Sequence, residues 1–212
     1  GGLWQVSAGG ETYSARQLVN AAGAWADQLG KMAGAEPIRL KPLRRTALII
    51  DAPDGMDIDE FAMVVDIDEE FYLKPDAGKL LISPANEDPE LPCDVQPDEL
   101  DVAICVDRIQ QAFDLPIRRI AHKWAGLRSF VADKEPVIGF SRGVPGFFWM
   151  AGQGGYGIQS APAKEHRRRS KGFAVMSHGF LETWFATSPW IMPGVWFIPV
   201  IVACLYSGLL TA

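Results

Sequence analysis

The sequence predicts a mixed α/β fold, in which a strand-rich domain is inserted into a discontinuous α/β domain and an apolar helical tail follows. Two observations predict this arrangement. The chain opens with strand and helix patterns, continues with strand patterns, and returns near residue 150 to a strand followed by a glycine-rich loop. Such interleaving is typical of a domain that carries an insertion. Finally, residues 183–212 contain no charged side chain.

The first elements are a hairpin, a strand and a short helix. "LWQV" and "YSA" flank a Gly-Gly turn and predict the hairpin, which leads into a buried strand over residues 18–21. "GAWADQLGKMAG" predicts a helix with Ala24, Leu29 and Met32 on its apolar face, ended by Gly34. Because a lone hairpin is barely stable in water, we expect further strands to precede residue 1 in the intact protein.

The middle of the chain is rich in strand patterns. Residues 44–53 predict one strand, and residues 61–85 contain three strand-like segments with a turn at "KPDAGK". "QPDELDVAICVDRIQQAFD" is the strongest helical pattern, with Pro97 in its first turn and Asp98 and Glu99 at the positive end of its dipole. Its expected apolar side consists of Leu100, Ala103, Ile104, Ile109, Ala112 and Phe113. A strand over residues 117–130 and a hairpin over residues 136–155 complete the pattern.

Charge and cysteine content restrict the partners and the compartment. The net charge of −6 argues against a nucleic-acid partner. The three cysteines lack metal-binding spacing, so we expect small apolar residues in a reducing compartment. The basic run "KEHRRRSK" (residues 164–171) precedes an apolar stretch, which predicts a bilayer span over residues 190–212 with residues 1–171 on the cytoplasmic face. The alternative is a buried helix pair, and three prolines weaken a straight helix.

The segment "MAGQGGYGIQSAPA" (residues 150–163) carries the clearest signal of a ligand. A continuous apolar run precedes four glycines, and a helix is expected to begin near Gly157. Glycines allow backbone N–H groups to approach a ligand, and a helix N-terminus favours negative charge. The alternative is a tight turn with no ligand.

Several segments together resemble the D-amino-acid oxidase superfamily of flavoproteins. They are "LVNAAGAWADQL", "HKWAGLRSFVADKEPVIGF" and "GFFWMAGQGGYGIQSAPA". "RRTALIID", "FYLKPDAGKLLISPANEDP" and "DVQPDELD" are similar to D-arginine dehydrogenases and related enzymes that act on D-amino acids. The resemblance covers residues 1 to about 163. It implies an FAD-binding domain with a Rossmann-like βαβ unit, of which this chain holds the C-terminal part, and a sheet-rich domain that shapes the substrate site.

The resemblance also implies the reaction and the cofactor residues. Members of the superfamily oxidise the Cα–N bond of an amino acid by hydride transfer to FAD, and the imine then hydrolyses. The electron acceptor is a quinone or oxygen, which the sequence does not distinguish. Residues 20–23 would pass the dinucleotide, and residues 153–159 would run along the isoalloxazine ring. The cofactor residues are Asn20, Ala21, Ala22, Gly23, Gln153, Gly154, Gly155, Tyr156, Gly157, Ile158 and Gln159.

Five residues are expected at the substrate. Arg128 in "GLRSF" would pair with the substrate carboxylate, because a planar guanidinium matches a carboxylate with two hydrogen bonds. Tyr72 and Arg45 occupy positions that line the pocket in the resembled family, and Gly155 and Ile158 match positions beside the substrate amine. We expect His122 to be a packing residue, since the substrate amine can lose its own proton.

The implied domains are residues 1–34 with 123–163 for FAD and residues 35–122 for substrate, followed by a basic linker over 164–182 and the apolar segment 183–212. The fingerprint G-x-G-x-x-G, expected near the start of such proteins, is absent there. The tail faintly resembles the entry of a fatty acid hydroxylase or sterol desaturase membrane domain, without its histidine clusters or any metal site. Two alternatives remain open: a glycine- or sarcosine-type oxidase, and a non-catalytic membrane-tethered remnant or fusion.

Overall fold

The computed structural model describes residues 2–53, 55–58 and 61–162, in two compact units. Residues 39–134 form the inserted unit, and residues 2–38 together with 135–162 form the discontinuous unit. Among the described residues, no helix is both long and apolar enough to cross a bilayer. The basic linker and the predicted span at residues 190–212 lie outside the described residues, so the membrane prediction stays a prediction.

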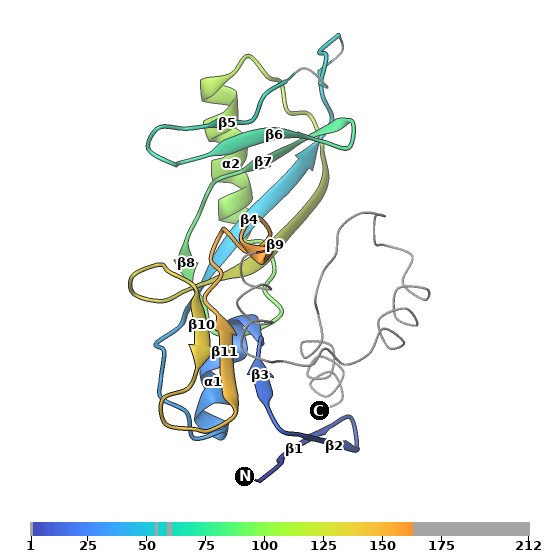
Figure 1. Ribbon diagram of the computed structural model, residues 1–212. Helices are drawn as coiled ribbons and strands as arrows, with labels where there is room; N and C mark the ends of the chain where they lie inside the picture. The colour runs from blue at the N-terminus through green and yellow to red at the C-terminus, as the bar shows by residue number, and fades with distance from the viewer. Residues whose placement is uncertain (1, 54, 59–60, 163–212) are drawn as a thin grey trace. The chain divides into compact units, whose positions relative to one another are not determined.

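The discontinuous unit contains a hairpin, a three-stranded sheet and a short helix (Figure 1). Strands β1 (Trp4–Ala8) and β2 (Glu11–Ala15) pair antiparallel, as expected. Strands β3 (Leu18–Asn20), β10 (Val137–Phe140) and β11 (Phe147–Ala151) form a sheet in the order β10-β11-β3. Strand β11 is antiparallel to β10 and parallel to β3. The 3-10 helix η1 (Gly23–Trp25) and helix α1 (Ala26–Met32) follow β3.

The buried face of α1 differs from the predicted one. Ala24 is buried as predicted, but it lies in η1; within α1 the buried residues are Ala26 and Gly30, Leu29 is half-buried, and Met32 is 82% exposed. Gly30 faces Trp149 of β11, whose ring occupies the space beside the helix backbone. The helix therefore packs through its smallest residues, which the apolar pattern of long side chains did not indicate.

The inserted unit is a six-stranded sheet with one helix packed across it (Figure 1). Strands β5 (Val64–Val65), β6 (Tyr72–Asp76), β7 (Lys79–Ser83), β4 (Lys41–Ile50) and β8 (Asp88–Pro89) follow in this spatial order. Strand β9 (Ile120–Phe130) pairs with β4 along its whole length. The turn between β6 and β7 has positive φ at Ala77 (47°) and Gly78 (77°), as two-residue hairpin turns require.

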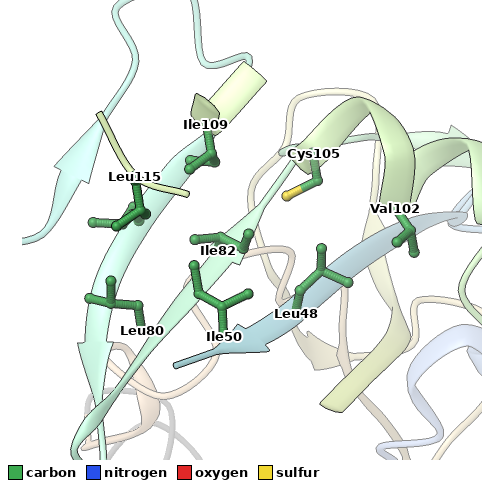
Figure 2. Packing of buried hydrophobic residues seen from close by; sticks show 9 residues of the cluster. Leu48, Ile50, Leu80, Ile82, Val102, Cys105, Ile109 and Leu115 are labelled. Atoms are coloured by element: carbon green, nitrogen blue, oxygen red, sulfur yellow. The ribbon is translucent and has the colours of Figure 1, made fainter. Parts of the chain in front are cut away.

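Helix α2 (Glu99–Ala112) covers one face of this sheet. Asp98 caps it by accepting a hydrogen bond from the backbone N–H of Leu100, so Pro97 precedes the helix instead of lying in its first turn. Figure 2 shows the core between helix and sheet, where Val102, Cys105 and Ile109 meet the strands. The strand and loop residues of this cluster are Leu48, Ile50, Leu73, Leu80, Ile82 and Leu115.

The observed helix face and domain boundaries both differ from expectation. Leu100, expected in the apolar side of α2, is 65% exposed, and Ala103 and Ala112 are exposed as well. The expected boundary between residues 122 and 123 lies within β9, which belongs entirely to the inserted unit because it pairs with β4 from residue 120 to residue 130. The inserted unit thus ends at residue 134 rather than 122.

Candidate flavin and substrate sites

The predicted cofactor residues follow two neighbouring parallel strands. Leu18, Val19 and Asn20 of β3 pair with Phe147, Phe148 and Trp149 of β11, respectively. Residues 21–23 leave the carboxyl end of β3, and residues 152–159 leave the carboxyl end of β11. Because the two strands are parallel and adjacent, both segments start from the same edge of the sheet. In open α/β sheets this edge is where ligands bind.

The side chain of Asn20 fixes the turn after β3. It is 2% exposed, its amide nitrogen donates to the backbone oxygen of Ala26 at 2.8 Å, and its oxygen accepts from the N–H of Ala22 at 3.3 Å. The amide thus holds the turn against the start of α1. Ala22 is buried, and Gly23 has φ +56°. We infer that the backbone of this turn, rather than the Asn20 side chain, is what a ligand would meet.

The glycine loop after β11 has the open backbone that its sequence predicts. Gly152 and Gly154 have φ +70° and +52°, values that favour glycine. The loop is closed by two hydrogen bonds of Gln153: its side-chain nitrogen donates to the backbone oxygen of Met150 at 2.9 Å, and its backbone oxygen accepts from the Tyr156 N–H at 3.0 Å. Tyr156 and Ile158 are 54% and 71% exposed. The expected helix start near Gly157 is a run of turns, and helical structure is assigned only from Ala161.

These residues fit one part of a flavin dinucleotide. Two left-handed glycines remove side chains from a loop at the ligand-binding edge, so a flat ring can approach the backbone there. The letters "GQGGYG" at residues 152–157 also have the spacing G-x-G-x-x-G directly after a strand, although this motif is expected near the start of such proteins. The residues present are therefore compatible with contacts to the flavin from residues 21–23 and 152–159.

The predicted substrate residues of the inserted unit lie on one face of its sheet. Side chains alternate between the two faces of a strand. Because Leu48, Ile50, Leu73 and Ile82 point to α2, the alternate positions point away from it. We call this second face the distal face. By register it carries Arg45, Ala47, Tyr72, Trp124, Gly126 and Arg128.

Arg45 lies between the other two predicted residues, and its pKa is shifted by its surroundings. It faces Gly126 across the β4–β9 pair, and Arg128 is two residues further along β9. Burial is the largest effect on Arg45 and lowers its pKa, and the positive charge of Arg128 lowers it further. Tyr72 and Glu87 oppose this shift. Arg128 and Tyr72 are therefore both close enough to Arg45 to affect its pKa.

The guanidinium group of Arg45 has one carboxylate partner among the described residues. Its Nη2 donates to Glu87 Oε1 at 3.0 Å, whereas its buried Nε has no hydrogen-bond partner there. The Arg45 side chain is 12% exposed. Two neighbouring guanidinium groups and a single carboxylate leave this part of the distal face with an excess of positive charge, which suits an anionic ligand.

Some residues of the distal face were not predicted. Trp124 lies two positions before Gly126 on the same strand and is 37% exposed, and the His122 ring stacks on it at a centroid distance of 5.6 Å. His122 was expected to be a packing residue, and it packs on Trp124 while remaining exposed itself. The alternation His122, Trp124, Gly126, Arg128 along one strand could have indicated this shared face.

The described residues contain no metal-binding group, and the hollow beside α2 includes none of the predicted site residues. They contain no group of three or more His, Cys, Asp or Glu side chains that could hold a metal ion. An open hollow beside the C-terminal end of α2, lined by residues 110–116, includes none of the predicted site residues.

Comparison with known proteins identifies the family. Residues 1–164 match the family described as FAD dependent oxidoreductase. Hydrogen cyanide synthase subunit HcnC from Pseudomonas aeruginosa is 28% identical over 152 residues, which cover 68% of this chain and 33% of the relative. The chain thus spans about a third of the length of that relative.

Solved structures show the same fold. Glycine oxidase from Geobacillus kaustophilus aligns with a TM-score of 0.64 at 23% identity, over 76% of this chain and 42% of that one. L-alpha-glycerophosphate oxidase from Mycoplasma pneumoniae, a structure with FAD bound, aligns with a TM-score of 0.64 at 18% identity, over 73% of this chain and 42% of that one. The match to the family over residues 1–164 shows that the chain belongs to the FAD dependent oxidoreductases, whose cofactor is FAD.

Proposed function

We propose that this chain is part of an enzyme that oxidatively deaminates D-amino acids. The observation that carries the proposal is the group formed by Arg45, Tyr72 and Arg128 on the distal face, in a chain of an FAD-dependent family. FAD, when bound, supplies the acceptor for the hydride that leaves the substrate Cα. The proteins that share the fold include a glycine oxidase, which supports an amine substrate.

The residues have separate roles in this proposal. Arg128 binds the substrate carboxylate, and Tyr72 shares that carboxylate through its hydroxyl. Arg45 supplies a second positive charge, because its guanidinium is close enough to Arg128 for each charge to affect the other. Residues 20–23 and 153–159 hold the flavin through their backbone, with Gly155 and Ile158 beside the substrate amine. An amine that loses its own proton needs no protein base, so His122 has no assigned role in the proton transfer.

The carboxylate role of Arg128 is tested by kinetics of the intact protein. We expect Arg128→Ala to raise KM for a D-amino acid by at least 30-fold, since losing a charged pair costs ~2–5 kcal/mol. Arg128→Lys should keep part of the affinity, because it preserves the charge but not the planar fork. Arg118→Ala, at an exposed position before β9, is the control. A change in KM below about threefold for Arg128→Ala would exclude this role.

The alternatives give different results in the same assays. A glycine- or sarcosine-type oxidase would turn over those two small amines in preference to any D-amino acid with a larger side chain. A non-catalytic remnant would turn over neither. Oxygen consumption and reduction of an added quinone distinguish the two electron acceptors that the proposal allows. Preference for L-amino acids over their D-enantiomers would contradict the proposed stereochemistry.

A further inference from the structure

Gly126 lies on the distal face between Trp124 and Arg128 of strand β9. It pairs with Arg45 across the strands, and its neighbours on the same face of β9 are Trp124 and Arg128. A Cβ atom built on Gly126 would meet no other atom within 4 Å. Its φ is not among the positive values, so the backbone does not require glycine here. The missing side chain therefore leaves space between a tryptophan and two arginines.

An aromatic surface borders this space on one side. Trp124 is 37% exposed, and the rings of Trp124 and His122 are nearly parallel, with an interplanar angle of 24°. Ala47, which pairs with Trp124, is 5% exposed and adds only a methyl group to the floor. A ligand that lies over Gly126 can thus place a flat group against Trp124.

The charges around Gly126 favour an uncharged flat group over a basic one. Arg45 lies directly across from Gly126 on β4, Arg128 lies two residues further along β9, and Glu87 is already paired with Arg45. No other carboxylate of the described residues forms an ion pair with either arginine. Further along this face, Lys74 is paired with Asp76. A basic side chain would bring a further cation into this excess of positive charge, whereas an uncharged ring would not.

We propose that Gly126 and Trp124 determine side-chain specificity, and that the substrate is an amino acid with an uncharged aromatic side chain. The carboxylate binds Arg128, the side chain runs along β9 over Gly126, and its ring packs on Trp124. This inference rests on the proposed function and specifies its substrate class. A basic amino acid such as D-arginine, the substrate of the dehydrogenases that several segments resemble, would place a third cation beside Arg45 and Arg128 and could use Trp124 only through a cation–π contact.

Three carboxylates that differ only in their tails test the inference on the intact protein. They are 3-phenylpropanoate, butanoate and 4-guanidinobutanoate, with dissociation constants measured by calorimetry. We expect 3-phenylpropanoate to bind at least about tenfold more tightly than 4-guanidinobutanoate, because ring packing adds to apolar burial. Trp124→Ala and Gly126→Leu should each weaken 3-phenylpropanoate by about tenfold and butanoate by less than about threefold. Ala121→Leu, at an exposed position of the same strand, is the control.

Each remaining outcome has a defined meaning. Tighter binding of 4-guanidinobutanoate by the unchanged protein would overturn the inference, whatever the variants do. If the unchanged protein bound all three carboxylates equally and Arg128→Ala bound none of them, the proposed side-chain specificity would be wrong while the proposed function would stand. Binding that survives Arg128→Ala, or no binding of any of the three, would contradict the carboxylate site itself. The circular dichroism of each variant shows whether it is folded.

Discussion

At the scale of single residues, Gly30 of α1 packs against the ring of Trp149 in β11. Trp149 is 1% exposed, and Phe147 packs on it at a centroid distance of 5.1 Å. A Cβ atom on Gly30 would lie 2.1 Å from Cη2 of Trp149. Because the ring is enclosed, it has little room to retreat. The glycine is thus required by packing between α1 and β11, which in turn positions the loop that follows β11.

Gly30→Ala tests this contact. Overpacking a closed site costs ~1–3 kcal/mol. We expect the free energy of unfolding to fall, because this cost exceeds the gain from the higher helix propensity of alanine. Gly139→Ala is the matched control, since Gly139 pairs with Trp149 on the neighbouring strand but its Cβ would meet nothing within 4 Å. Urea unfolding of both variants supplies the measurement. An equal effect of the two substitutions would show that the ring moves aside.

At the scale of elements, strands and turns could be predicted but helix faces could not. The hairpin β6–β7 and the position of Asp98 near the start of α2 follow from local turn and capping chemistry. The predicted apolar face of α2 was wrong in including Leu100, because a second set of apolar residues, Val102, Cys105 and Ile109, also fits a 3.6-residue period and is the buried one. The deciding residue is Asp101, a carboxylate that is 8% exposed. Its burial depends on Arg44, which lies far away in the sequence.

Asp101 joins α2 to the sheet. Its Oδ2 accepts hydrogen bonds from Arg44 Nε at 3.1 Å, Thr46 Oγ1 at 3.2 Å and Asn86 Nδ2 at 2.9 Å. Burial alone would lower the pKa of Arg44, but the carboxylates of Asp101, Asp88 and Glu90 outweigh it and raise that pKa. Arg44 is therefore stabilised as a cation by Asp101 of the helix, Asp88 of β8 and Glu90 directly after β8.

Asp101→Ala should destabilise the inserted unit strongly. Removing one partner of a buried ion pair leaves the other charge uncompensated, which costs ~3–5 kcal/mol. Asp88 and Glu90 remain near Arg44, so we expect the lower end of that range. Asp107→Ala, an exposed aspartate of the same helix, is the control. Thermal unfolding would contradict the proposed role if the two variants lost similar stability.

At the scale of the whole molecule, the insertion was predictable but its boundary was not. The return from strand patterns to a glycine loop indicated that one domain resumes after another. The expected end at residue 122 was wrong because β9 pairs with β4 along its whole length, and pairing over long sequence separations has no local signal. Of the candidate site, the resemblance predicted Arg45, Tyr72 and Arg128, while Trp124 and Gly126 were not predicted and were placed beside them by the register of β9.

Glu36 joins the two chain segments of the discontinuous unit where the inserted unit leaves and returns. Its carboxylate accepts hydrogen bonds from Ser141 Oγ at 2.5 Å and from the N–H of Arg142 at 3.1 Å. The Ser141 hydrogen bond is the main cause that lowers the pKa of Glu36 from 4.5 to about 2. A depressed pKa of an acid means that the folded state favours the charged form. The contact therefore stabilises the fold above pH 4.5 and is lost as the pH falls toward 2.

The final prediction concerns this acid-sensitive contact. Between pH 5 and pH 2.5, hydrogen-exchange protection of the Arg142 N–H should fall several-fold, corresponding to ~1 kcal/mol because Glu36 is only partly buried. Glu36→Gln keeps an acceptor of the same shape without the charge, so its Arg142 N–H should be less protected at pH 5 and nearly insensitive to pH. Asp114→Asn, at an exposed position of the inserted unit, controls for general acid effects. If Arg142 in the unchanged protein stayed equally protected at both pH values, the depressed pKa of Glu36 would not stabilise the junction.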